Sequence, residues 1–86
     1  MILKKNIFVA ERSIKDNVFI AFENEYYCLD KVGYDVWKMI NGEITVVEII
    51  KSIAKKYKID FKRAETDVSE FIQDLINNKL VKEVSS

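Results

Sequence analysis

The first third of the chain alternates short apolar runs with polar residues, a pattern typical of short β-strands. The runs Ile7–Val9, Val18–Phe22 and Tyr26–Leu29 are rich in β-branched and aromatic residues, with polar residues at 15–17 and 23–24 between them. The second run is apolar on both faces, so helices must cover at least one face. The pattern predicts a three-stranded antiparallel meander that needs the rest of the chain to fold.

From residue 31 onward the apolar residues take up helical spacing. Asp30 is a suitable N-cap and Asn41-Gly42 a suitable stop, which predicts a first helix over Lys31–Ile40. Gly33 is a weak point inside this helix, because glycine lowers helix stability. Trp37 lies on the apolar side of the helix and is expected in the core.

Two more helices follow with a short link between them. Thr45 and Glu48 have capping-box spacing, and the apolar face that follows indicates a second helix ending near Lys58. Asp60 is placed to cap a third helix over about Phe61–Asn77.

Leu80-Val81 then closes the domain. We therefore expect one α+β domain over residues 1–86, with a three-stranded antiparallel sheet followed by three helices (β-β-β-α-α-α). Because the link between the second and third helices is short, these two should form a winged helix-turn-helix-like pair.

Composition indicates a globular domain with few reactive groups. Hydrophobic residues make up 49% of the chain and charged residues 33%, and the formal net charge is zero, so no overall field attracts nucleic acid or anionic lipid. One cysteine and no histidine exclude an internal disulfide and the usual zinc ligand sets. We expect no cofactor or metal and a reducing cytoplasm. We expect no membrane insertion, because no apolar run approaches the ~18 residues that span a bilayer.

The residues of acid–base and nucleophilic catalysis are sparse. Histidine and Gly-rich phosphate loops are absent, and no serine has a basic partner of the triad type. Cys28 lies in a predicted strand, where a free cysteine is expected to pack as a small apolar residue. The carboxylates of the third helix are typical of a solvated face. We therefore expect a binding protein rather than an enzyme.

One candidate ligand is DNA, which helix-turn-helix pairs with a β-wing often bind. Basic residues gather around the turn between the second and third helices: Lys51, Lys55, Lys56, Lys58, Lys62 and Arg63. The third helix becomes acidic in its second half, and those carboxylates would meet phosphate repulsion. We therefore interpret the cluster as a solvated face that complements the helix dipole, with docking to an acidic patch on a partner enzyme as an alternative.

The other candidate is an extended peptide, which can pair with the exposed edge of the predicted sheet. The third predicted strand, with Glu25 before it, carries Tyr26 and Tyr27, and tyrosine gives a large contact area at low entropy cost. The tyrosines are equally consistent with ordinary strand packing.

An ordered set of residues then favours the peptide. It comprises Tyr26-Tyr27-Cys28-Leu29-Asp30, Gly33, Val36-Trp37, Gly42, Thr45-Val46-Val47-Glu48-Ile49, Tyr57, Asp67-Val68, Phe71 and Leu75. Over residues 18 to 81 this set resembles the PqqD-like family, small recognition domains that hold the leader segment of a precursor peptide while a partner enzyme modifies the rest. Two positions depart from the family pattern: Asp30 stands where Asn is typical, and residues 78–81 lack the usual Gly.

The resemblance implies that a leader peptide adds as an antiparallel strand to the edge formed by Glu25 to Leu29, in a groove beside the third helix. A helical plot places Val68, Ile72 and Leu75 in the core and Phe71 at the margin of the apolar arc. The candidate peptide-binding residues are Glu25, Tyr26, Tyr27, Cys28, Leu29, Arg63, Asp67, Phe71 and Asp74. Alternation alone does not decide which tyrosine faces the groove.

The expected partners are a precursor peptide and its modifying enzyme or leader peptidase. The family serves lasso peptides, radical-based thioether peptides and the pyrroloquinoline quinone precursor, and we favour a lasso-peptide or radical-enzyme system. We expect no nucleic acid partner, and a monomer, although an exposed strand edge can also pair with a second copy.

Overall fold

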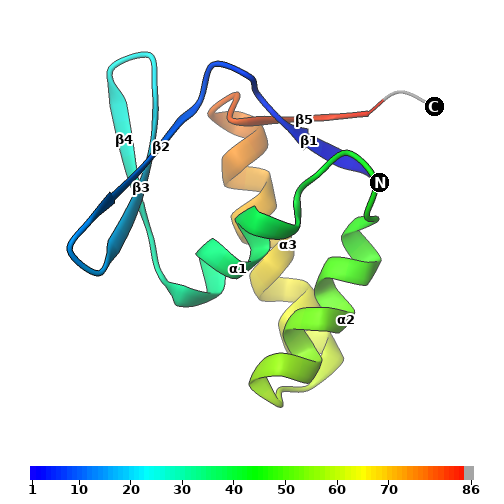
Figure 1. Cartoon of the computed structure of the whole chain (residues 1–86). Coiled ribbons are helices and arrows are strands. Elements are labelled where there is room, and N and C mark those ends of the chain that lie inside the picture. Colours follow the sequence, from blue (N-terminus) through cyan, green and yellow to red (C-terminus); the bar gives the residue numbers. More distant parts are fainter. Residues whose placement is uncertain (85–86) are drawn as a thin grey trace.

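The computed structural model describes residues 1–84, and Figure 1 shows its elements. The strands are β1 (Leu3–Lys5), β2 (Ala10–Ile14), β3 (Asn17–Phe22), β4 (Glu25–Leu29) and β5 (Val81–Glu83). The helices are α1 (Lys31–Met39), α2 (Val46–Tyr57) and α3 (Phe61–Asn77). Strands β2, β3 and β4 form an antiparallel sheet in that order, and the three helices follow it. The predicted α+β class and its order are confirmed.

The predicted first strand is wrong. Ile7 and Phe8 lie in a turn, and the outer strand β2 is Ala10–Ile14, most of which is exposed. Its register is fixed by a two-residue turn with Lys15 in the left-handed region (φ 57°), so that Ile14 pairs with Asn17. Strand β2 is held by backbone pairing at a solvated edge. Its sequence therefore lacks the run of apolar residues that would identify a strand.

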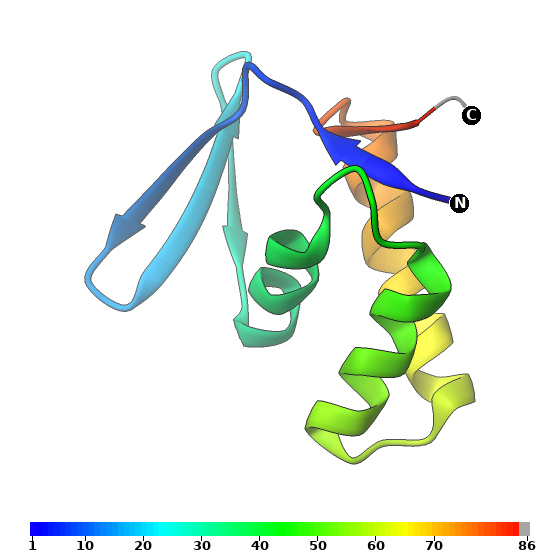
Figure 2. The same cartoon turned by 45° about the vertical axis from the view of Figure 1, so that its right-hand side comes forward.

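A second, two-stranded sheet was not predicted. Strand β1 pairs antiparallel with β5, and Figures 1 and 2 show the two strands side by side across the end of α3. Leu3 and Val81 contribute the buried side chains of this sheet, and Leu80 is buried beside them. The expectation that Leu80-Val81 closes the core is therefore confirmed, although three-residue strands are too short to show a hydrophobic period.

Helix boundaries follow the predicted caps. The Gly33 N–H donates to Asp30 Oδ1 at 2.7 Å, and Thr45 with Glu48 forms the complete capping box. Asp60 occupies the N-cap position of α3 but its side chain makes no capping hydrogen bond. Helix α2 ends where Lys58 turns into the left-handed region (φ 53°). None of the helices in the described part of the chain is long and apolar enough to cross a membrane.

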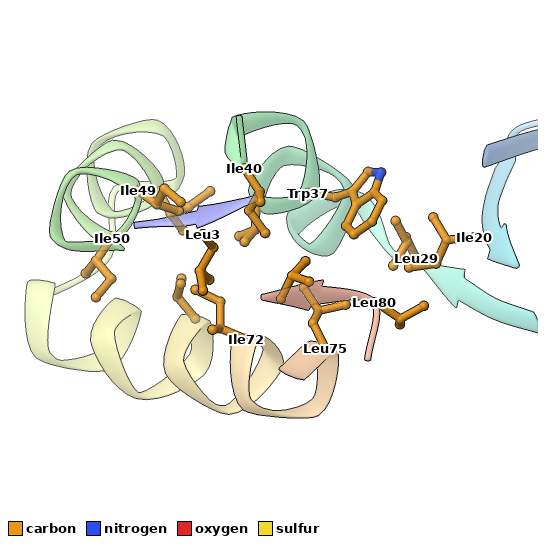
Figure 3. Packing of buried hydrophobic residues seen from close by; sticks show 14 of the residues in the cluster. Leu3, Ile20, Leu29, Trp37, Ile40, Ile49, Ile50, Ile72, Leu75 and Leu80 are labelled. Carbon is orange, nitrogen blue, oxygen red and sulfur yellow. The ribbon is translucent and has the colours of Figure 1, made fainter. Parts of the chain in front are cut away.

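One hydrophobic core joins both sheets and all three helices. It consists of Leu3, Ile20, Leu29, Val36, Trp37, Ile40, Ile49, Ile50, Ile53, Ala64, Val68, Ile72, Leu75, Leu80 and Val81. Figure 3 shows Trp37 between the helical core and the sheet residues Leu29 and Ile20. The Trp37 Nε1–H donates to Glu11 Oε1 at 2.8 Å, which ties α1 to β2. Trp37 is 2% exposed, so its predicted core position is confirmed.

A buried carboxylate fixes α1 against α2. Asp35 is 5% exposed and accepts hydrogen bonds from Lys56 Nζ at 2.7 Å and from the Tyr57 hydroxyl, while Lys38 Nζ lies 3.4 Å from it. The bond from Lys56, followed by that from Tyr57, lowers the pKa of Asp35 to about 2. The Asp35 hydrogen bond in turn raises the pKa of Tyr57 to about 12. This network holds the middle of α1 against the last turn of α2.

Candidate functional site

Strand β4 leaves one backbone edge unpaired. It is the last strand in the order β2-β3-β4, and no other strand of the described residues pairs with it on the far side. In Figure 2 the three-stranded sheet stands to one side of the helices, and β4 runs directly into α1. An unpaired edge of this kind can accept an extended chain through backbone hydrogen bonds.

The turn between β3 and β4 determines which β4 groups face outward. Glu23 and Asn24 (φ 51° and 66°) form a two-residue turn, and Phe22 pairs with Glu25. In such a hairpin the pair that flanks the turn is hydrogen-bonded, and bonded and non-bonded pairs then alternate along the strands.

It follows that Tyr27 and Leu29 direct their N–H and C=O groups to β3, as Glu25 does. Tyr26 and Cys28 direct theirs to the open edge. The outward donors and acceptors of the site therefore belong to these two residues.

The side chains of β4 alternate between the two faces of the sheet. Tyr27 pairs with the fully buried Ile20 and is itself half-buried against the core, whereas Tyr26 is 72% exposed on the opposite face. Tyr27 is thus the tyrosine on the helix side. Cys28 is exposed, so the expectation that it packs as a small apolar residue is wrong. The period-two alternation puts it on the outer face, which no helix covers.

Helix α3 presents a stripe of side chains along one side. Arg63, Asp67, Phe71, Asp74 and Asn78 follow one another at spacings of three or four residues, which aligns them on one helix face. Phe71 is half-buried and is the apolar member, while Asp67 and Asp74 are exposed. The predicted core residues of α3 lie on the adjacent face and are buried: Val68, Ile72 and Leu75.

One cleft joins the stripe to the start of α1. Phe71 and Asp67 from α3 face Asp30, Val32, Gly33 and Val36 across a volume of about 250 Å³. A Cβ added at Gly33 would lie 3.4 Å from Phe71 Cζ and 3.0 Å from Asp30 Oδ1. The glycine therefore leaves room chiefly for the Asp30 carboxylate that caps α1, and the Phe71 ring lies against the same backbone position. The cleft has an apolar floor, with the carboxylates of Asp30 and Asp67 at its rim.

A second cleft lies at the other end of β4. It has a volume of about 410 Å³ and is lined by Phe22, Glu23, Glu25, Tyr27, Asn77, Asn78 and Lys79. The two clefts therefore stand at the Leu29 end and the Glu25 end of the same strand, and each has α3 as its opposite wall.

The strand and the helix also match in length. Residues 67–77 of α3 rise about 15 Å, and β4 extends about 13 Å from Glu25 to Leu29. The open edge and the α3 stripe can therefore contact the same extended segment of about five residues.

The structure brings most of the sequence-predicted residues to the groove between β4 and the α3 stripe, with three exceptions. Glu25 and Tyr27 line one cleft, Phe71 and Asp67 line the other, and Asp74 lies on the stripe between them. Arg63 extends the stripe, and its Nε lies 3.9 Å from Asp67 Oδ2.

The exceptions are Leu29, Tyr26 and Cys28. Leu29 is 7% exposed, so its side chain belongs to the core rather than to the groove. Tyr26 and Cys28 have their side chains on the outer face and offer only their backbone groups to the open edge. These positions follow from the alternation of side chains along β4, and the sequence alone did not show which face of the sheet the helices cover.

Several groove residues were missed. Asn77, Asn78 and Lys79 come from the end of α3, and Glu23 comes from the hairpin turn. The helical spacing from Phe71 through Asp74 to Asn78 was the available signal. No sequence pattern indicated that Glu23 of the hairpin turn would line the groove, because this depends on where the turn lies relative to α3.

The basic residues of the turn between α2 and α3 line neither of the two clefts beside β4. Lys56 is bound to Asp35 and Arg63 lies near Asp67, so two of its cations have acidic neighbours. The exposed surface of α3 beyond Arg63 carries Glu65, Asp67, Glu70 and Asp74. This charge distribution is unfavourable for insertion of α3 into a DNA groove.

Comparisons with known proteins point to one family. Residues 9–81 match the model of the family described as "Coenzyme PQQ synthesis protein D (PqqD)". Among solved structures, the chain is similar to "TbiB1 in Complex with the TbiA(beta) Leader Peptide", with a TM-score of 0.82 and 26% sequence identity over 96% of this chain and 99% of that one. A search of curated protein sequences gives no match.

Proposed function

The chain belongs to the PqqD family, and from this premise we propose that it binds the leader segment of a ribosomally synthesised precursor peptide by strand addition. It then presents the rest of the precursor to a modifying enzyme such as a protease, a cyclase or a radical enzyme. Residues 1–86 act as one recognition domain in this proposal. The likeness to a structure that contains a leader peptide supports it.

The observation that carries the proposal is the pairing of an open strand edge with a helix stripe of the same length. Tyr26 and Cys28 offer two outward N–H and two outward C=O groups, which an antiparallel peptide strand would satisfy. Backbone pairing supplies affinity without regard to sequence, so the side chains around the edge must supply the specificity. The two clefts, one around Phe71 and one around Tyr27, fit that role.

The proposed roles of individual residues follow from their positions. Phe71 and Gly33 form the floor of a pocket for one apolar leader side chain, and Asp67 at the rim accepts a hydrogen bond or pairs with a leader cation. Tyr27 and Glu25 contact the leader at the other end of β4. Tyr26, Cys28 and Leu29 contribute through the strand backbone, and Asp74 and Arg63 lie along the helix wall.

This function needs no reactive group of the chain itself. The sequence has no histidine, and no cluster of three metal-ligating side chains occurs within residues 1–84. We propose that the chain is an accessory binding protein and that the chemistry belongs to its partner enzyme.

Fluorescence anisotropy tests the proposal. The purified protein is titrated against a labelled leader segment and a labelled random DNA duplex at about 150 mM salt, where weak phosphate contacts are screened. Saturable leader binding with no DNA signal supports the proposal. Salt-sensitive DNA binding without leader binding would refute it and favour a winged-helix DNA-binding function. Gel filtration at the assay concentration detects edge-paired dimers, which would compete with the leader.

A further inference from the structure

A third cleft, larger than the two beside β4, is separate from the peptide groove. It has a volume of about 660 Å³ and lies between the β1–β5 sheet, the turn before β2 and the end of α3. Its lining residues are Lys4, Lys5, Asn6, Ile7, Phe8, Ile76, Lys79, Val81, Lys82 and Glu83. Only Lys79 also lines the groove, where it stands at the Glu25 end. We call this surface the basic cleft.

The basic cleft departs from the charge balance of the chain. Four lysines and a single carboxylate line it, whereas the whole chain has a net charge of zero. Lys4 and Lys82 are directly opposed in the β1–β5 register, an arrangement in which like charges destabilise a sheet. None of the four lysines takes part in an ion pair within residues 1–84, and only Lys5 has another partner there, the Trp37 ring at 4.9 Å from its Nζ. The surface therefore favours a negatively charged ligand.

The cleft also presents apolar side chains on a fixed turn. Ile7 and Phe8 are 87% and 76% exposed, although both are large and hydrophobic. Asn6 holds the turn: its Oδ1 accepts from the Phe8 N–H at 2.9 Å, and its Nδ2 donates to the Lys79 carbonyl at 2.9 Å. A rigid, exposed apolar pair of this kind is typical of an interaction site.

Lys79 occupies a backbone position that favours glycine. It has φ 61° at the end of α3, where Lys79 N donates to the Ile76 carbonyl and Leu80 N to the Leu75 carbonyl in the pattern of a Schellman motif. A lysine at this left-handed position is strained relative to glycine. The Lys79 side chain lies between the basic cleft and the groove. The position therefore carries a positive charge, although its backbone conformation favours glycine.

The direction of a bound leader connects the two surfaces. A leader antiparallel to β4 would run from the Leu29 end to the Glu25 end, so its carboxyl-terminal continuation emerges beside Lys79. That continuation is the part of a precursor that a modifying enzyme must reach. An enzyme docked in the basic cleft would therefore stand where the substrate segment leaves the groove.

From these observations we infer that the basic cleft is the docking site for the modifying enzyme, which inserts a segment of acidic and apolar side chains. The carboxylates would face Lys4, Lys82 and Lys79, and an apolar side chain would pack on Ile7 and Phe8. This inference rests on the proposed leader-binding function. It assigns a second, separate surface to the partner enzyme.

Lys82→Glu is the sharpest test, because it reverses one charge of the cleft and also places a carboxylate opposite Lys4. An opposite-charge pair replaces a like-charge pair, so the variant should melt at the same or a higher temperature than the parent chain. The assay measures affinity for the purified modifying enzyme of the same biosynthetic system, and separately for the leader segment. We expect enzyme affinity to fall about tenfold or more, with leader affinity unchanged.

Two further variants complete the design. Phe8→Ser should weaken enzyme binding through the apolar contact, without any change of charge. Lys55→Glu makes the same charge reversal at an exposed position of α2 that is distant in sequence from the cleft residues. Its affinity for the enzyme should stay within about twofold of that of the parent chain.

The outcomes separate the two proposals. Absence of enzyme binding by the parent chain, or equal enzyme affinity of Lys82→Glu and Lys55→Glu, overturns the docking site even when the leader binds normally. Loss of leader binding in Lys82→Glu also overturns it, because the cleft would then belong to the peptide site. A parent chain that binds anionic phosphatidylglycerol vesicles through Lys82, but not the enzyme, would assign the cleft to a membrane instead. Failure of the leader to bind the parent chain is a failure of the proposed function.

Discussion

Proline substitutions on β4 test strand addition one residue at a time. Proline removes a backbone N–H and places a ring carbon where the hydrogen was. The Cys28 N–H faces the open edge, whereas the Tyr27 N–H is bonded within the sheet to Ile20. Cys28→Pro should therefore weaken leader binding while the chain stays folded, and Tyr27→Pro should unfold or strongly destabilise it.

The expected sizes follow from the bonds that are lost. Cys28→Pro removes one intermolecular hydrogen bond, with a net value of about 0.5–1.5 kcal/mol, and its ring also obstructs the leader carbonyl. The total is about 1–3 kcal/mol, which corresponds to a roughly 5- to 150-fold weaker affinity. Tyr27→Pro removes an N–H that is bonded inside the sheet and leaves its partner carbonyl unpaired, which should cost about 1–3 kcal/mol of folding stability, a large part of the ~5–15 kcal/mol of a small domain.

Alanine variants at the same two positions are the matched controls, because they change the side chains and keep the N–H groups. Leader affinity is measured by anisotropy and stability by urea denaturation. If Cys28→Pro binds the leader as tightly as Cys28→Ala, the leader does not pair with this edge. A Tyr27→Pro chain as stable as Tyr27→Ala would show that the assignment of outward groups is reversed.

Three other perturbations address the pocket and its support. Phe71→Ala should weaken leader binding by about 1–3 kcal/mol if its ring anchors a desolvated contact, and anisotropy on the folded variant measures this. Gly33→Ala should improve helix propensity by up to about 1 kcal/mol, yet its Cβ would crowd Asp30 Oδ1 at 3.0 Å and occupy the cleft floor beside Phe71; we expect weaker leader binding without loss of helicity by circular dichroism. The depressed pKa of Asp35 contributes stability that is present above about pH 4 and is lost as the pH falls toward about 2. Because Lys56 is half exposed, we expect this contribution to be about 1–2 kcal/mol, and acid titration of Asp35→Asn by urea denaturation should show a correspondingly flatter slope.

Sequence patterns predicted the elements that have a strong local signal. The capping residues Asp30 and Thr45 and the apolar arcs of the three helices set boundaries that the structure reproduces to within one or two residues. The hairpin of β3 and β4 was also found, because its turn residues are polar and its strands are rich in aromatic and β-branched side chains. These features depend on residues close together in the chain.

The rest depends on contacts between distant segments. Strand β2 is exposed and polar, so only its pairing with β3 defines it. The β1–β5 sheet joins residues about eighty positions apart, and the basic cleft arises only where that sheet meets the end of α3. For the groove, helical spacing placed Phe71 and Asp67 together. The faces of the sheet on which the Tyr26 and Leu29 side chains lie could be assigned only from the observed strand register.

Hydrogen exchange at individual backbone amides, measured with and without leader peptide, is the sharpest test of strand addition at β4. If the leader pairs with this edge, the amides of Tyr26 and Cys28 gain protection when it binds. The outward amides of Glu11 and Ser13 on the opposite edge strand β2 should stay unchanged, and they serve as an internal control. Saturating leader binding that leaves Tyr26 and Cys28 unprotected, or that protects Glu11 and Ser13 instead, would contradict strand addition at β4.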